Sequence, residues 1–350
     1  MKIIIDCIVF NLQKQGGVSL YFSELIKHLQ QKRHVTLINN YITNNIYFNE
    51  YKLQDNNQSI GKYKLLFKRF ASESTPSNEK YIFHSSYFRI SKNKNAINIV
   101  TVHDFMYEKY YPLLKRMVHV WQKKKALNRS SGIICVSHNT RHDLLKYHPE
   151  FAHKKITVIH HGVSNAYYPI NGISKKKYIL YVSGRKYYKN FELVPDVMKQ
   201  LHQYHLIIVG GGDLDSKEIE LLKPILGRYT TVSGVSNSKL NILYNEAHCL
   251  MYPSAYEGFG LPVLEAISAG CPVVCQRSSS LPEITGSDYD LLYDGYSSQN
   301  IINNILKLED EKYRESMVHY GIERSKQFSW ESANKQLIDF YHHVYYDKKN

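Results

Sequence analysis

The chain has 350 residues and a hydrophobic content of 43%, which suits two domains of moderate size better than one. Its formal net charge of +14 favours an acidic partner: a phosphate-bearing substrate, an anionic membrane surface or a nucleic acid. A compositional origin stays open, because Lys, Asn, Ile and Tyr are all abundant, as in proteins from A+T-rich genomes.

Several classes of protein are disfavoured. The sequence has no helix-turn-helix, RNP string or zinc-finger spacing, so we expect no nucleic-acid partner. It has no apolar run of 18 residues and no secretory layout at its N-terminus, so neither a transmembrane helix nor a signal peptide is predicted. The five cysteines show no metal or redox spacing, which is typical of reduced core thiols and predicts a cytoplasmic protein.

The first half of the chain opens with a strand, a glycine turn and a helix. An apolar run at 2–10 precedes Gly16-Gly17, and the following residues have apolar side chains at helical spacing. This order predicts the start of a Rossmann-type unit, with the glycines at the N-terminus of the helix. Two more strands are expected, at 82–86 and 97–105, and the β-branched, apolar second one is typical of a buried parallel strand.

His103 and Asp104 stand at the carboxyl end of the second of these strands, where open α/β sheets bind ligands. A neutral imidazole there can hydrogen-bond a hydroxyl group, and Asp104 either sets the tautomer of that histidine or only caps the strand. Further along, Ser137 and Thr140 open a helix after a buried strand at 132–137, where capping alone would explain the serine.

Two basic segments are candidates for a membrane surface. The segment 62–70 mixes Lys and Arg with Leu and Phe, and the helical stretch 112–131 combines many cations with Trp121. Such aromatic–basic mixtures can lie on anionic lipid, although an ordinary helix with a solvated basic face would explain them too.

The second half repeats the plan of the first. A strand at 178–184 is followed by Arg185 and Lys189, a planar fork and a point charge that suit a diphosphate. A strand at 206–213 then opens into three glycines, and 231–254 predicts a strand, a turn and a helix. The boundary between the halves is expected at about residue 165.

The segment 253–272, PSAYEGFGLPVLEAISAGCP, carries the most specific pattern. Glu257 and Glu265 flank a loop with two glycines, and Pro262 suits the first turn of a helix. Glycines and a helix N-terminus can cradle a diphosphate, whereas two carboxylates are better suited to hydroxyl groups. A ligand that carries both a diphosphate and several hydroxyl groups is a nucleotide sugar. The alternative is a surface loop with two solvated glutamates.

This string resembles the signature of retaining glycosyltransferases of family 4. The family has the GT-B architecture, an α/β fold of two Rossmann-like domains whose parallel sheets face each other across a cleft. The resemblance implies an acceptor-binding domain at 1–165, a nucleotide-sugar donor domain at 166–335, and a C-terminal helix at 336–350 that packs back on the first domain. It extends from Gly16 to the Phe328-Ser329-Trp330 string.

The resemblance also implies a reaction. A hexose-type sugar would pass, with retention, from a nucleoside diphosphate sugar to a hydroxyl of a glycan or lipid-linked oligosaccharide, in the synthesis of bacterial O-antigen or capsule. In such enzymes Arg185 and Lys189 would neutralise the leaving diphosphate and His103 would contact the sugar. Arg185 lies one position later than in the commoner pattern, and Ser183 replaces a usual glycine, so Lys189 is the safer assignment.

The two glutamates have implied roles as well: Glu257 binds hydroxyls of the donor sugar, and Glu265 binds the ribose. The remaining implied donor-binding residues are Gly16, Gly17, Val235, Gly258, Phe259, Gly260 and Leu261. Acceptor contacts are implied for Asp104, Ser137 and Thr140. No metal and no cofactor are expected, because fixed cations would balance the diphosphate and no His/Cys cluster suggests a metal site.

Other readings stay open. A nucleotide-sugar epimerase or a phosphorylase would share the architecture, and a phosphorylase would need a lysine that holds pyridoxal phosphate. A non-catalytic nucleotide-sugar-binding protein would tolerate loss of Lys189 and Glu257. A basic nucleic-acid binder would show a steep dependence on salt.

Overall fold

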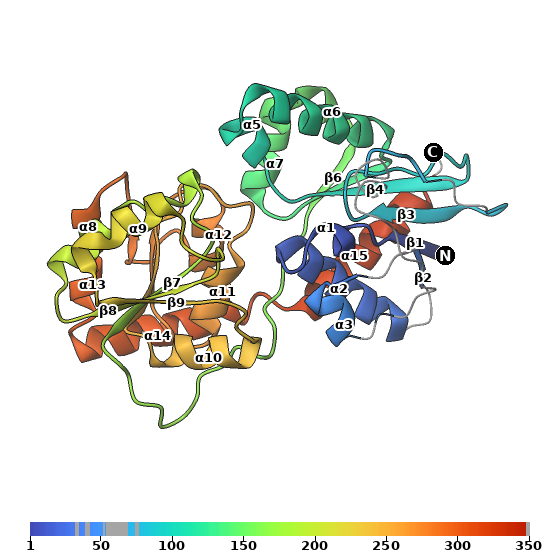
Figure 1. Ribbon diagram of the computed structural model, residues 1–350. Helices are drawn as coiled ribbons and strands as arrows, with labels where there is room; N and C mark the ends of the chain where they lie inside the picture. The colour runs from blue at the N-terminus through green and yellow to red at the C-terminus, as the bar shows by residue number, and fades with distance from the viewer. Residues whose placement is uncertain (32–34, 39–42, 52, 54–68, 74–76, 348–350) are drawn as a thin grey trace. The chain divides into compact units, whose positions relative to one another are not determined.

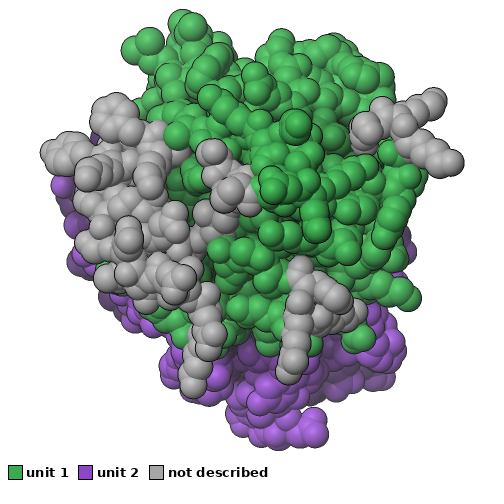
Figure 2. Space-filling view, turned by 90° about the vertical axis from the view of Figure 1, so that its right-hand side faces the viewer, with its two compact units in different colours: residues 1–161, 330–350 green, residues 162–329 purple. Residues whose placement is uncertain are grey.

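The computed structural model describes residues 1–31, 35–38, 43–51, 53, 69–73 and 77–347. These residues form two compact units, which are coloured separately in Figure 2. Unit 1 comprises residues 1–161 and 330–350, and unit 2 comprises residues 162–329. The chain therefore leaves unit 1 a few residues before the boundary expected at 165 and returns at Trp330. Most of the basic segment 62–70 lies outside the described residues.

Unit 1 is built on a six-stranded parallel sheet with the order β2-β1-β3-β4-β5-β6. Its four central strands, β1, β3, β4 and β5, are apolar and mostly buried on both faces, as expected for a parallel sheet covered by helices, whereas the edge strands are partly exposed. The strands are β1 (Lys2–Asp6), β2 (Val35–Ile38), β3 (Tyr81–Ser85), β4 (Ala96–Val102), β5 (Gly132–Cys135) and β6 (Lys155–Val158).

Helices lie on both sides of this sheet (Figure 1). They are α1 (Val9–Leu12), α2 (Gly17–Gln31), α3 (Ile46–Glu50), α5 (Met106–Tyr110), α6 (Leu113–Arg129), α7 (His138–Tyr147) and α15 (Trp330–Tyr345). The sequence-based prediction of one strand over 2–10 was wrong in its second half, because residues 9–12 turn into the short helix α1. The last helix, α15, packs against α2 and β3, and the Tyr341 hydroxyl lies 2.5 Å from His84 Nδ1.

Unit 2 repeats the architecture with the strand order β12-β11-β10-β7-β8-β9, again all parallel. The central strand β7 is fully buried, and the order reverses direction next to it, which is the switch point of a doubly wound sheet. The strands are β7 (Tyr178–Val182), β8 (His205–Val209), β9 (Tyr229–Val232), β10 (Cys249–Tyr252), β11 (Val273–Gln276) and β12 (Leu292–Tyr293).

The helices of unit 2 also cover both faces of its sheet (Figure 1). They are α8 (Leu193–Gln200), α9 (Ser216–Leu222), α10 (Asn237–Glu246), α11 (Leu261–Ser268), α12 (Leu281–Thr285), α13 (Ser298–Lys307) and α14 (Glu311–Ser325). The predicted α/β fold of two Rossmann-like units is confirmed. The five cysteines are buried and unbridged, as the sequence indicated.

Candidate active site

The glutamate-flanked segment of unit 2 forms a loop and the helix α11, as predicted. Gly260 precedes the helix with φ of 111°, a backbone conformation that L side chains rarely adopt. A Cβ at this position would lie 2.9 Å from Cδ2 of Leu281, so packing also requires glycine. Pro262 occupies the first turn, where its missing N–H costs no helical hydrogen bond. Pro262 has no N–H and the Val263 N–H donates to the Gly260 carbonyl oxygen at 3.0 Å, so an anionic group here would be met by the Leu261 N–H and the positive end of the helix dipole.

Two serines hold the loop before α11 in place. Ser279 accepts a hydrogen bond from the Glu257 backbone N–H at 2.9 Å, and it does so from a left-handed conformation with φ of 48°. The buried Ser280 hydroxyl lies 2.6 Å from the Phe259 carbonyl oxygen and 3.1 Å from that of Glu257. The sequence offered no role for either serine. Both fix the backbone that carries Glu257.

Glu257 forms an ion pair with Lys189. The distance between Lys189 Nζ and Glu257 Oε1 is 2.5 Å, and the two side chains are only 13% and 12% exposed. Lys189 ends a 3-10 turn at Tyr187–Lys189, and the next residue, Asn190, is left-handed with φ of 49°. Asn190 donates from Nδ2 to the Pro253 carbonyl oxygen at 2.9 Å. It thereby ties the turn after β7 to the segment after β10 and brings the two charges together.

The structure ties Arg185 to the glycine-rich loop after β8. Its guanidinium donates to the carbonyl oxygens of Gly210 at 2.7 Å, Gly212 at 3.0 Å and Asp213 at 2.9 Å. The Nε atom lies 2.8 Å from a carboxylate oxygen of Glu218, which completes the capping box of α9 with the N-cap residue Asp215. Arg185 therefore shapes the loop even without a ligand, a role that the sequence did not indicate.

We predict that Arg185→Lys lowers kcat about tenfold and lowers Tm by a few degrees. Lysine keeps the charge, but it cannot reach several carbonyl oxygens with one planar fork, so the loop at 210–213 loses its support. A thermal melt and steady-state kinetics on the same preparation check this. Unchanged Tm with unchanged kcat would contradict a role in the loop.

Glu265 lies on α11 and accepts a hydrogen bond from the Tyr244 hydroxyl at 3.3 Å. Burial raises the pKa of its carboxyl to about 7, although hydrogen bonds from Tyr244 and Tyr167 act in the opposite direction. A carboxyl in this state is only partly ionised near neutral pH. Donors supplied by a ligand, such as the two hydroxyls of a ribose, would stabilise its ionised form.

The remaining donor-binding candidates of unit 2 lie on turns. Val235 follows β9 and is partly buried, next to Gly234, which has φ of 65°. Phe259 is buried against the ring of Phe328, with a centroid distance of 6.2 Å. Leu261 begins α11 directly after Gly260. The Phe259 side chain is therefore part of the packing of the loop, so any ligand contact there falls to backbone atoms.

In unit 1 the glycine pair lies where it was predicted, at the start of α2. Gly17 is the first residue of α2, and a Cβ on Gly16 would lie 2.7 Å from Oε1 of Gln13. That same oxygen accepts a hydrogen bond from the Ser19 backbone N–H at 3.3 Å. The glutamine side chain thus takes one donor of the first helical turn and needs the space that glycine leaves.

His103 directly follows β4 and lies beside α2. Its ring contacts the ring of Tyr21 edge to face, with centroids 5.3 Å apart. Burial, with help from the charge of Lys123, lowers the pKa of His103 to about 3, so the imidazole is neutral. Its buried Nε2 has no hydrogen-bond partner among the residues that the structure describes. A buried polar atom in this state suits a ligand hydroxyl.

The three acceptor candidates of unit 1 have structural contacts. Asp104 accepts a hydrogen bond from the Met106 backbone N–H at 3.0 Å, at the start of α5. Ser137 caps α7 by accepting from the Thr140 backbone N–H at 3.0 Å, and both side chains are fully buried. Capping therefore accounts for Ser137, the alternative that the sequence left open, and acceptor binding by these residues stays a prediction.

Two protein-family models match this chain. One, described as glycosyl transferases group 1, matches residues 165–324, and the other, Glycosyltransferase Family 4, matches residues 77–167. Among curated proteins, the O-antigen chain mannosyltransferase B of Escherichia coli is 30% identical over 312 residues, 81% of this chain and 79% of that protein. The O-antigen chain mannosyltransferase RfbU of Salmonella typhimurium is 27% identical over 248 residues, 67% of this chain and 69% of that one.

Solved structures resemble the fold over nearly the whole chain. Anabaena Alr3699/HepE, determined with UDP-glucose, superposes with a TM-score of 0.75 at 14% identity, covering 98% of this chain and 100% of that one. Sucrose-phosphate synthase from Thermosynechococcus elongatus gives a TM-score of 0.73 at 20% identity, with 99% of each chain covered. At these identities the likeness concerns the fold.

Proposed function

Because this chain belongs to the family 4 glycosyltransferases and has their GT-B fold, we propose that it moves a hexose-type sugar from a nucleoside diphosphate sugar to a hydroxyl of a glycan or lipid-linked acceptor. The proposed reaction retains the anomeric configuration and needs no metal ion. Its place is the synthesis of a bacterial O-antigen or capsule. The names of the O-antigen mannosyltransferases among its relatives support this pathway and make mannose the first sugar to test.

The observation that carries the proposal is the Lys189–Glu257 pair beside the N-terminus of α11. A mostly buried cation and the positive end of the α11 helix dipole can together bind the two phosphates of the donor. When the diphosphate takes over Lys189, the carboxylate of Glu257 is released to accept hydrogen bonds from sugar hydroxyls. Before the donor binds, the ammonium of Lys189 and the carboxylate of Glu257 therefore neutralise each other.

The chemistry follows from that arrangement. The leaving diphosphate gains negative charge as the glycosidic bond breaks, and fixed cations and N–H groups stabilise that charge without reorganising. Attack from the face of the departing group gives retention, and the diphosphate itself takes the proton of the acceptor hydroxyl. We propose that the neutral His103 in unit 1 hydrogen-bonds a hydroxyl of the donor sugar near the reacting carbon.

The first test is a thermal-shift panel with UDP, GDP, dTDP and ADP, followed by the sugar donors of any nucleotide that binds. We expect one of the four nucleotides to raise Tm, since ligand binding to the native state stabilises it. Release of that nucleotide from its sugar donor in the presence of a glycan or lipid-linked acceptor would then demonstrate transfer. Binding without any turnover would favour the non-catalytic alternative.

We also propose that unit 1 contacts an anionic membrane surface through α6. This helix carries six Lys or Arg residues and no Asp or Glu. Five large apolar side chains on it are each more than half exposed: Leu113, Leu114, Met117, Val118 and Trp121. Exposed apolar side chains beside cations suit the interface of an anionic bilayer. Among the described residues, no helix combines the length and the hydropathy of a membrane span.

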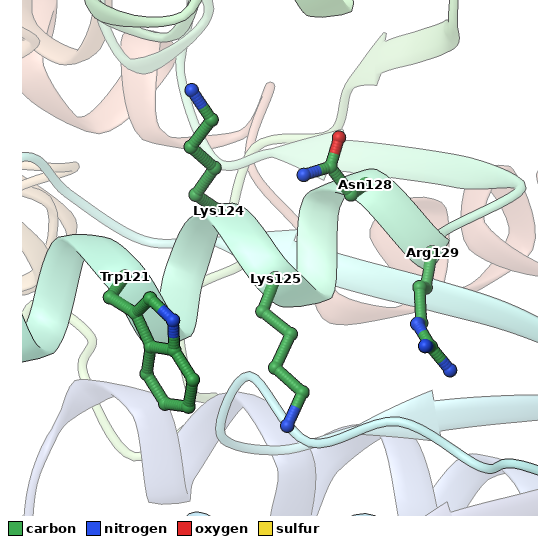
Figure 3. Close-up of a pocket in the computed structure, with 5 residues that line it drawn as sticks. All are labelled: Trp121, Lys124, Lys125, Asn128 and Arg129. Carbon is green, nitrogen blue, oxygen red and sulfur yellow. The ribbon is translucent and has the colours of Figure 1, made fainter.

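The cationic end of α6 forms a shallow pocket of about 280 Å³, shown in Figure 3. Trp121, Lys125 and Arg129 point to the same side of the helix there, and Lys125 Nζ lies 5.1 Å from the centre of the Trp121 ring. Lys124 points to the other side and forms an ion pair with Glu150 at 2.8 Å. An indole and two cations that form no ion pair with any described residue lie on one side, and this arrangement suits lipid phosphate at the depth of the headgroups.

We predict that Leu114→Ser together with Trp121→Ser lowers binding to vesicles of phosphatidylglycerol and phosphatidylcholine at least fivefold in a flotation assay. Leu226→Ser is the matched control, because Leu226 is 76% exposed but lies in unit 2. Wild-type protein should bind vesicles of phosphatidylcholine alone weakly, and added salt should release it. Equal binding to both vesicle types would leave genome composition as the explanation of the basic charge.

A further inference from the structure

Lys123 is a fully buried lysine on the inner side of α6, and none of the roles described above uses it directly. Its side chain is 0% exposed. The Nζ atom donates to the backbone carbonyl oxygen of Asp104 at 2.9 Å and to Oε1 of Glu108 at 2.7 Å. It also lies 4.0 Å from the centre of the Phe105 ring. The ammonium group is therefore held at the turn between β4 and α5.

Stability alone does not explain a charged pair at this place. Taking an ammonium and a carboxylate out of water costs several kcal/mol for each ion, and apolar replacements of a buried pair are often as stable or more so. Glu108 is buried together with Lys123, and one of its carboxylate oxygens, Oε2, is buried as well. The pair lies at the end of β4, next to His103, and this location points to a role other than stability.

His103 is the residue directly before Asp104. The carbonyl oxygen that Lys123 binds belongs to the Asp104–Phe105 peptide, one residue beyond His103, so the ammonium restrains the turn between β4 and α5. We propose that Lys123 is a positioning residue: through the Asp104 carbonyl and Glu108 it holds the turn that aims the imidazole of His103. This inference rests on the proposed role of His103 in transfer.

Lys123 also acts on His103 through its charge, which adds to the larger effect of burial in lowering the pKa of the imidazole. The titratable groups around the ring come from five segments besides its own strand: Tyr21 on α2, His84 on β3, His161 after β6, Lys123 on α6 and Glu108 on α5. Burial lowers the pKa of His84 and of His161, so both are neutral near pH 7. Besides burial, Lys123 is then the cation that opposes protonation of His103.

The test separates positioning from stability. Lys123→Met alone leaves Glu108 buried without its partner, so we expect it to fold poorly. The informative variant is Lys123→Met with Glu108→Met, which removes both charges and should keep Tm within a few degrees of wild type. Lys154→Met is the control, because Lys154 also donates to backbone carbonyl oxygens in unit 1, those of Asn128 and Ser130, at 2.8 and 2.7 Å.

We expect the double variant to lose at least tenfold in kcat with little change in KM for the donor, and Lys154→Met to keep wild-type kinetics. The acid limb of its pH–rate profile should move to higher pH, because His103 becomes easier to protonate without the cation. Wild-type kcat and an unmoved acid limb in a stable double variant would overturn the proposal.

A second readout does not depend on turnover. In ¹⁵N-histidine spectra, with the His103 signal assigned by His103→Gln, the imidazole should stay neutral down to about pH 5 in wild type and titrate at higher pH in the double variant. The same titration curve in both proteins would exclude the electrostatic role. If wild type proves inactive with every donor, the proposed function fails while this titration still decides the role of Lys123.

Discussion

Lys189→Ala is expected to lower kcat at least 100-fold while Tm stays within a few degrees of wild type. The reason is electrostatic: the ammonium group that pairs with Glu257 at 2.5 Å would stabilise the charge on the departing diphosphate, and such fixed groups are worth about 100- to 1000-fold in rate. Steady-state kinetics with the donor found in the thermal-shift panel measure the effect. Lys189→Arg should recover part of the lost kcat, because arginine restores the positive charge, although on a planar guanidinium group.

Glu257→Ala is expected to show a loss of similar size, with the larger share in KM for the donor sugar. Because the two residues form one pair, the double variant should lose much less than the product of the two single losses. Lys199→Ala is the matched control: Lys199 forms an exposed ion pair with Asp196 in the same unit at 2.8 Å. Exposed pairs of this kind contribute little. Near-wild-type kcat in either Lys189→Ala or Glu257→Ala would refute this assignment of the site.

The elements of the fold could be predicted where the sequence carries local signals. Apolar, β-branched runs located the strands, and Gly260 with Pro262 located the start of α11, because backbone sterics restrict which residues can stand there. The bounds were less certain. The strand β1 ends at Asp6, since the chain turns into α1, and no property of residues 7–10 taken alone distinguishes that turn from a continued strand.

Contacts between distant segments could not be predicted in the same way. The sequence around Ser279 and Ser280 does not indicate that their hydroxyls bind the loop around Glu257, which lies more than 20 residues away. Arg185 was identified from its charge, but its bonds to the 210–213 carbonyl oxygens depend on how β7 and β8 pair. Lys123 looked like one of several cations on a helix, and its burial follows from the rotation of α6 on the sheet. A local pattern indicates which residues are chemically suitable, whereas tertiary packing decides what each one contacts.

Glu265→Gln is expected to change stability and affinity in opposite directions. Because the pKa of the Glu265 carboxyl is about 7 in the folded protein, above its ordinary value of 4.5, the folded state binds a proton that the unfolded state has already lost. The stability of the free protein should therefore fall as pH rises from about 4.5 to about 7 and stay low above that. The difference corresponds to about 3 kcal/mol at pH 8. Glutamine, which stays neutral, should raise Tm at pH 8 and leave it nearly unchanged at pH 5.

Affinity for the nucleotide should move the other way. If ribose hydroxyls donate to the ionised carboxylate, binding releases a proton near pH 7, and Glu265→Gln should weaken binding at least tenfold at pH 8 and less at pH 6. Calorimetry in two buffers of different ionisation enthalpy measures that proton. Glu309→Gln is the control of opposite sign, because a hydrogen bond from Tyr204 lowers the pKa of the Glu309 carboxyl, so this variant should lose stability at pH 8. Nucleotide binding that is independent of pH in wild type and equal in Glu265→Gln would place the ribose elsewhere. A carboxyl that destabilises the free protein at neutral pH and gains further hydrogen-bond donors from the ligand is then explained by function, because folding alone would favour glutamine at this position.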